Sequence, residues 1–189
     1  MMCRKAARQT EFLETPMVST TPSSDAQPNA GRRIRSGQGR CYEEFTVGDT
    51  YEHRPGRTIS DTDNTWFTLL TMNTHPLHFD HAYAAKSEFG KPLVNSCLTL
   101  SIVVGMSVND VSQKAIGNLG WNDIKLSAPV FAGDTIYAES TVLAKRESAS
   151  RPTQGVVTVR TVGKKADGTE FMSFERTVLV PKLGHAIES

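Results

Sequence analysis

The sequence predicts a single α+β domain in which one antiparallel sheet surrounds one long apolar helix. The helix is indicated by residues 93–108, where ten of sixteen side chains are Leu, Val, Ile, Met or Cys and none is charged. Because this segment is apolar on every side, most of its surface must be buried. The sheet is indicated by alternating apolar and polar residues in three later segments, 135–144, 155–164 and 170–180. An Asp-Gly pair at 167–168 is a hairpin signal between the last two. A sheet wrapped around the helix is the simplest way to bury it.

The elements before the apolar helix are predicted from local signals. Residues 51–59 have the composition of a strand, which the Pro-Gly pair at 55–56 must interrupt or bend. Ser60 and Asp61 then offer an N-cap for a helix whose apolar stripe starts at Trp66. The Asn, Thr and Pro residues of 72–80 indicate a loop, and a short helix is expected at about 81–87.

The chain divides into one domain and two tails. Residues 1–39 are rich in Ser, Thr, Pro, Gln and Gly and have no sustained period, so we predict a disordered N-terminal tail. The domain is then expected at 40–183, with a short C-terminal tail at 184–189. A chain of 189 residues is long enough to bury one stable core.

Charge and composition exclude several kinds of partner. Residues 1–40 carry seven basic and three acidic side chains, whereas residues 41–189 carry 14 basic and 17 acidic ones. A mildly acidic body argues against nucleic acid as the main partner. No apolar run approaches the ~20 residues of a membrane span, and no secretory signal pattern is present.

Three scattered cysteines without metal-ligand spacing favour a cytoplasmic location. Cys97, inside the apolar run, is expected to be a small core residue.

Proton-handling side chains gather in the predicted loop, where His75, His78, Asp80 and His81 follow one another closely. On composition alone, solvated loop and helix-cap residues explain this group. A zinc site is an alternative, since these side chains are suitable ligands. Pro76 and the loop prevent the regular helical spacing of specific zinc motifs, and no second Cys or His cluster follows. We therefore predict no metal.

Three short motifs, in the order in which they occur, indicate a protein family more specifically than the composition of the loop does. Residues 73–80 read Asn-Thr-His-Pro-Leu-His-Phe-Asp, residues 89–96 read Phe-Gly-Lys-Pro-Leu-Val-Asn-Ser, and residues 129–135 read Pro-Val-Phe-Ala-Gly-Asp-Thr. Together they resemble the MaoC-like dehydratase and (R)-specific enoyl-CoA hydratase family, whose hydratase motif is Asp-x-Asn-Pro-Leu-His-x-Asp. The resemblance extends from about residue 42 to residue 180. It implies that the α+β domain has the hot-dog fold of that family.

The resemblance also implies an activity. Family members add water reversibly across the double bond of a 2-enoyl-CoA, so we expect a hydro-lyase. Coenzyme A is expected only as part of the acyl-CoA substrate, and no separate cofactor is expected. A homodimer or higher oligomer is expected, because relatives pair two sheets edge to edge, which removes an exposed edge strand. The form of the hydratase motif at residues 73–79 resembles that of one branch of the family, which acts on branched dicarboxylyl thioesters such as mesaconyl- or itaconyl-CoA. A substrate carboxylate would favour cationic or amide side chains, which could come from Arg54, Arg57, His75 and Asn95.

Site residues follow from the matching positions. In the family an Asp and a His activate water, and backbone N–H groups at the start of the central helix hold the thioester oxygen. His78 is expected to carry the proton, because histidine titrates near neutrality. Ser96, next to Asn95, is expected to supply the N–H group, since a helix N-terminus stabilises negative charge. Asp80 is expected to cap the helix that follows it.

The sequence departs from the motif at its catalytic position. The usual Asp is Asn73 and the usual Asn is His75. An amide cannot accept and hold a proton at neutral pH, so Asn73 can only orient water or substrate. Three alternatives follow: His78 acts alone beside an Asn73 that positions water, His75 replaces the lost carboxylate, or the domain binds acyl-CoA without turning it over or needs a partner subunit. A hot-dog thioesterase is a further alternative.

Overall fold

The computed structural model of the chain describes residues 31–35 and 39–187. The prediction of a disordered tail therefore falls largely outside the described residues. Of the predicted tail, residues 33–35 form a short strand, so the described fold begins before the expected boundary at residue 40.

A six-stranded sheet has the order β1-β2-β4-β5-β6-β3. Its strands are β1 (Arg33–Arg35), β2 (Thr50–Thr58), β3 (Gly117–Leu126), β4 (Thr135–Glu147), β5 (Gln154–Lys165) and β6 (Glu170–Pro181). The pairing is antiparallel throughout, except that β1 runs parallel to β2. The three strands predicted after the apolar helix are confirmed as β4, β5 and β6, and a tight hairpin joins β5 to β6.

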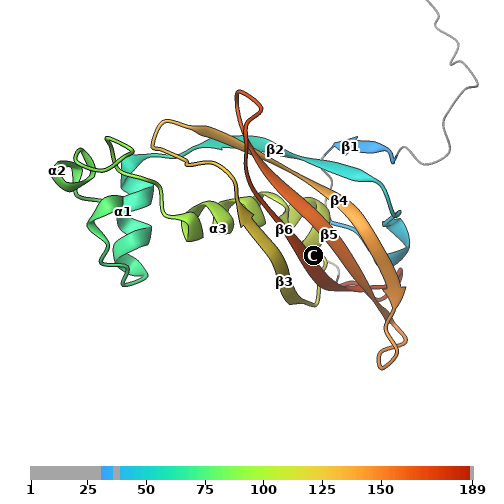
Figure 1. Cartoon of the computed structure of the whole chain (residues 1–189). Helices are drawn as coiled ribbons and strands as arrows, with labels where there is room; N and C mark the ends of the chain where they lie inside the picture. Colours follow the sequence, from blue (N-terminus) through green and yellow to red (C-terminus); the bar gives the residue numbers. More distant parts are fainter. Residues whose placement is uncertain (1–30, 36–38, 188–189) are drawn as a thin grey trace, which may run out of the picture.

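The helical segments are η1 (Tyr42–Glu44), α1 (Asp61–Leu70), η2 (Pro76–His78), α2 (His81–Ala84), α3 (Ser96–Met106) and the π-helix η3 (Val108–Ser112). Figure 1 shows the long strands passing alongside α3, while α1 and α2 lie beyond one end of the sheet. Ser60 caps α1 as predicted, because its side chain accepts the Asp63 N–H. The arrangement is the α+β hot-dog fold that the sequence predicts.

The core lies between α3 and the concave side of the sheet. Leu98 and Val103 of α3 pack in one cluster with Ile136 and Phe171 of the sheet. A β-bulge interrupts β2 between His53 and Arg57, at the predicted Pro-Gly pair. Burial of these apolar side chains, at about 25 cal/mol per Å² of apolar surface, is the main force that holds the helix to the sheet.

The opposite side of α3 is less buried than the sequence predicts. Cys97, Ser101 and Gly105 are exposed, so the expectation of a core role for Cys97 is wrong. A single sheet covers only one side of a helix, and the small polar residues of α3 lie on the uncovered side.

A buried polar chain accounts for one histidine outside the loop. His53 Nδ1 lies 2.8 Å from a carboxylate oxygen of Asp110, and Nε2 lies 2.8 Å from Ser140 Oγ. All three side chains are fully buried. The chain joins β2 and β4 to η3, which follows α3, and so fixes the C-terminal end of the central helix.

Candidate active site

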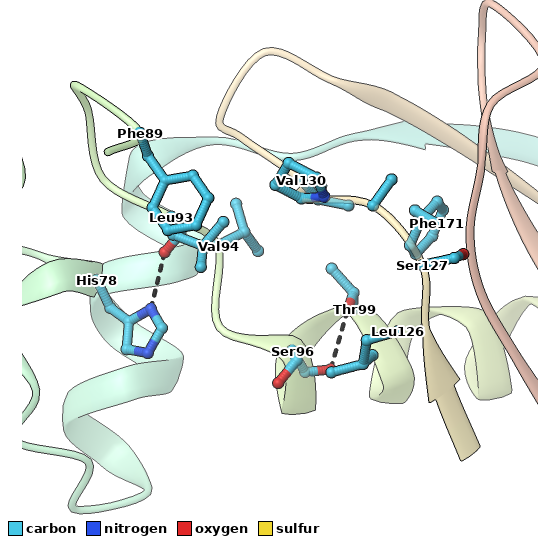
Figure 2. A pocket seen from close by; sticks show the side chains of 12 residues that line it. His78, Phe89, Leu93, Val94, Ser96, Thr99, Leu126, Ser127, Val130 and Phe171 are labelled. Atoms are coloured by element: carbon cyan, nitrogen blue, oxygen red, sulfur yellow. Dashed lines mark hydrogen bonds between the residues drawn. The ribbon is translucent and has the colours of Figure 1, made fainter. Parts of the chain in front are cut away.

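A cavity of about 320 Å³ lies between the η2 loop, the start of α3 and the segment that follows β3. Its polar lining residues are His78, Ser96, Thr99 and Ser127, and its apolar ones include Phe89, Leu93, Val94, Leu126, Val130 and Phe171. Figure 2 shows His78 and Ser96 on one side of this space, with Val130 and Phe171 across from them. The cavity therefore combines a proton-handling group, a helix N-terminus and apolar walls.

His78 is half-buried in η2 and is held through one ring nitrogen. Its Nδ1 lies 2.8 Å from the carbonyl oxygen of Leu93, as the dashed line in Figure 2 marks. A carbonyl oxygen only accepts, so Nδ1 must carry the proton and donate it to this bond. In the neutral ring, Nε2 then has the lone pair that a general base needs.

Ser96 is the first residue of α3, and Asn95 caps the helix. The Asn95 side-chain oxygen accepts the Cys97 N–H at 2.9 Å, and the Asn95 carbonyl accepts the Leu98 N–H at 3.0 Å. N–H groups in a first helical turn have no acceptor within the helix, and the helix dipole adds positive potential there. Ser96, which lines the cavity, is thus suited to bind a developing negative charge through its N–H.

Asn95, also predicted at the site, is buried behind the cavity wall rather than in it. Its side-chain amide nitrogen donates to Thr68 Oγ1 at 3.3 Å, while its oxygen forms the helix cap. Both ends of the amide are therefore used inside the fold, and the structure places Asn95 as a support for the residue that follows it.

Asn73 and His75 belong to the same loop as His78 but have different surroundings. The Asn73 side-chain oxygen accepts the His75 N–H at 3.0 Å, and His75 Nδ1 accepts the Leu77 N–H at 3.2 Å. The His75 and His78 rings meet edge to face, with centroids 5.8 Å apart. Neither Asn73 nor His75 lines the cavity. Of the three predicted catalytic side chains, only His78 lies in its wall.

Asp80, another polar residue of the loop, has a structural role. Asp80 caps α2, because its side chain accepts the Tyr83 N–H at 3.0 Å, as predicted. Within the described part of the chain, no group of three or more His, Cys, Asp or Glu side chains is arranged to hold a metal ion.

The two arginines considered for a substrate carboxylate lie elsewhere. Arg54 and Arg57 line a second cavity of about 600 Å³, together with Phe67 and residues of the exposed side of α3. Arg57 is paired with Asp63 of α1, and the Arg54 guanidinium lies 5.0 Å from the centre of the Tyr137 ring. The structure therefore does not bring these arginines to His78.

Charged groups do lie beside the His78 cavity. Phe89 of the cavity wall packs against Phe131, and Lys91 Nζ lies 4.2 Å from the centre of the Phe131 ring. Asp134 forms an ion pair with Lys165. Burial alone would raise the pKa of Asp134, but hydrogen bonds from Lys165 and the Phe131 N–H hold it below its usual value.

Several site residues could not be found from the sequence. The Leu93 carbonyl is a backbone group, which no side-chain pattern reveals. Leu126 and Phe171 lie on strands remote in sequence from the loop, and strand pairing alone brings them to the cavity. The apolar alternation of β6 was a signal for a buried face but not for a cavity wall.

The fold and this site together define a MaoC-like hot-dog domain, with a hydratase-motif loop set against the start of the central helix. A family model described as mesaconyl-CoA hydratase matches residues 24–188, and the chain belongs to that family. Among the described residues, no helix has the length and apolar character needed to cross a membrane.

Three relatives illustrate the similarity. A mesaconyl-CoA hydratase from Cereibacter sphaeroides is 33% identical over 79% of this chain, which spans only 43% of that enzyme. An (R)-specific enoyl-CoA hydratase from Rhodospirillum rubrum is 30% identical over 68% of this chain and 84% of that protein. The crystal structure of a putative MaoC domain protein dehydratase from Chloroflexus aurantiacus is 29% identical, with a TM-score of 0.72. The match covers 87% of this chain and 45% of the Chloroflexus chain. The chain thus spans less than half the length of the mesaconyl-CoA hydratase it matches.

Proposed function

We propose that this domain catalyses the reversible hydration of a 2-enoyl-CoA thioester, with the acyl group bound in the cavity beside His78. One observation carries the proposal: His78, with the lone pair on Nε2, and the first residue of α3 line the same cavity. A base for water and a donor for the thioester oxygen are the two groups that the reaction requires.

The proposed reaction balances with these two groups. His78 Nε2 takes a proton from water while the water oxygen bonds to the β-carbon of the enoyl group. The electrons of the double bond move toward the thioester, and the negative charge on its oxygen is stabilised by the Ser96 N–H. The imidazolium then returns the proton to the α-carbon, which regenerates the neutral ring and completes the addition of water. The reverse sequence eliminates water.

Asn73 is proposed to act on the loop rather than on the proton. Its side-chain oxygen already accepts the His75 N–H, which stabilises the turn that leads into η2. An amide at this position can keep that turn although it cannot serve as a base. This geometry supports the alternative in which His78 is the only acid–base group, and it gives His75 no direct place in the cavity wall.

The acyl group is proposed to bind against the mainly apolar walls of this cavity. The names of relatives support an enoyl-CoA in general, and mesaconyl-CoA in particular, as candidate substrates. Lys91, which lies against Phe131 beside the Phe89 wall, is a cation that could favour an anionic substrate.

We also propose that the working form is a dimer of two copies paired through β3. This strand is at the edge of the sheet and exposes Leu119, Trp121, Ile124 and Leu126. Unpaired apolar edge strands promote association. Leu126 also lines the His78 cavity, so pairing at β3 would complete its wall.

Two other functions are consistent with the fold. Asn73 in place of the usual carboxylate favours a subunit that binds acyl-CoA without turning it over. A thioesterase would instead use the cavity to release free coenzyme A.

A three-way assay separates these functions. The protein is incubated with crotonyl-, mesaconyl- and itaconyl-CoA while enoyl absorbance and free thiol are followed. Loss of absorbance without thiol release supports hydration, and thiol release supports a thioesterase. Binding of the thioesters without any turnover would refute the proposed hydration.

A further inference from the structure

We propose that Asn64 of α1 is a positioning residue for this site, because its buried side chain ties the His78 loop to the start of α3. The inference rests on the proposed hydration and extends it to a residue outside the cavity wall. Asn64 is only 2% exposed, in a helix that otherwise presents mainly exposed side chains.

The Asn64 side chain makes three hydrogen bonds to backbone groups of two distant segments. Its amide nitrogen donates to the His78 carbonyl at 2.7 Å and to the Leu93 carbonyl at 3.1 Å. Its oxygen accepts the Asn95 N–H at 2.8 Å. The three bonds reach the residue that carries the base and the cap of the oxyanion helix.

The chemistry of these partners requires an amide at position 64. Two carbonyl oxygens need two N–H donors on one side, and one backbone N–H needs an acceptor on the other. A carboxamide is the side chain that offers this set in one plane. A carboxylate of the same shape keeps the acceptor but places an oxygen against two carbonyl groups.

The Leu93 carbonyl links Asn64 to the direction of the His78 ring. This oxygen receives both the Asn64 amide N–H and the His78 Nδ1–H, at 3.1 and 2.8 Å. Asn64 therefore fixes the acceptor that holds Nδ1 and leaves Nε2 as the base. Through the Asn95 N–H, the same amide fixes the residue immediately before Ser96. Asn64 thus sets the spacing between the two reacting groups without contacting the substrate.

The proposal is tested with Asn64→Asp, and with Asn64→Ser as a second variant if the first does not fold. Ser60→Ala is the matched control, because it removes the N-cap of the same helix but has no contact with His78, Leu93 or Asn95. Thermal melting is measured for each variant. Steady-state hydration of the best enoyl-CoA gives kcat and KM, and nitrogen NMR of the His78 ring reports its tautomer.

The positioning variants are expected to lower kcat by about 10- to 100-fold with KM changed by less than about threefold, because small displacements of reacting groups cost rate more than binding. They should also change the His78 tautomer signal. Ser60→Ala should lower the melting temperature and leave kcat and the tautomer as in the wild type.

Wild-type kcat and wild-type His78 signals in the folded Asn64 variants would overturn the proposal. Equal losses in Ser60→Ala would overturn it as well, since general loosening of α1 would then be the cause. If the wild-type protein hydrates no enoyl-CoA, the proposed function fails. The NMR comparison still decides whether Asn64 orients His78.

Discussion

The carbonyl oxygen of Leu93 lies 2.8 Å from His78 Nδ1 and fixes the tautomer of the histidine. Leu93 comes shortly before the start of α3, so the same short segment orients the proposed base and leads into the helix that is proposed to bind the thioester oxygen. The motif loop and the helix are separate in sequence, and this bond is one of the contacts that make them a single site.

Replacing Ser96 with proline tests the backbone donor. Proline is tolerated at the first position of a helix, and Asn95 before it has φ −59° and ψ 124°, which suit a residue that precedes proline. Ser96→Pro should therefore keep the fold but lose the N–H, and kcat should fall by roughly 100-fold or more. Ser96→Ala keeps the N–H and should change kcat by less than about threefold. Equal effects of the two variants on hydration would assign the role to the side chain instead.

Asn73 offers a test of whether an amide at this position limits the proposed hydration. Asn73→Asp keeps an oxygen that can accept the His75 N–H, so hydration should stay within about threefold of the wild type, whereas Asn73→Ala loses the turn and should lower kcat about tenfold. Initial rates at saturating enoyl-CoA measure both. A large gain in rate for Asn73→Asp would show that a second base can act from this position.

The edge strand β3 predicts the effect of a charge on assembly. Ile124→Lys should raise the dimer dissociation constant by at least about tenfold, because it places an ammonium group where an apolar side chain is expected to be covered. Leu143→Lys, on the central strand β4, is the matched control. Light scattering after size-exclusion chromatography measures the mass. A wild-type monomer, or equal dissociation in both variants, would contradict pairing through β3.

The capping box of α1 predicts a specific acid response. The pKa of Asp63 is held below its usual value mainly by the hydrogen bond from the Ser60 N–H. The Ser60 hydroxyl and the Arg57 guanidinium lower it further, although burial opposes this. A carboxylate with a lowered folded pKa stabilises the protein above its unfolded pKa of ~3.9 and loses that contribution as the pH falls through the folded value. Asp63→Asn should thus lower the free energy of unfolding at neutral pH by roughly 0.5–1 kcal/mol.

Urea unfolding at several pH values checks this response. The difference between wild type and Asp63→Asn should shrink as the pH falls below about 4. A difference that stays constant across the acid range would mean that the charge of Asp63 contributes nothing.

Patterning explains which parts of the fold the sequence could predict. The alternation in β4, β5 and β6 identified these strands, since each buries one face in the hydrophobic core. The caps Ser60 and Asp80 were predictable because each accepts an N–H group only three residues further along the chain. Strand β3 lacks such alternation. Most of its side chains are exposed, and it lies at an edge of the sheet.

Only part of the candidate site could be predicted from the sequence, and the reason is physical. His78 and Ser96 were recognisable from a motif, but their supports are contacts across 14 to 31 residues that depend on the folded path of the chain. Asn64 carries no local signal, because its three partners are backbone groups. The second cavity, which is lined by arginines, shows that residues close in sequence can also lie apart in the fold. Arg54 and Arg57 are near the motif in sequence, yet they line a different cavity from His78.

The most direct test compares the hydration of crotonyl-CoA by the wild type and by His78→Ala, with His81→Ala as a control at an exposed histidine of the same region. The wild type should yield the hydroxyacyl-CoA product. His78→Ala should be slower by about 10²- to 10⁴-fold while it still binds the thioester, and His81→Ala should match the wild type. A His78→Ala protein that hydrates at the wild-type rate would contradict the assignment of the base and, with it, the proposed site.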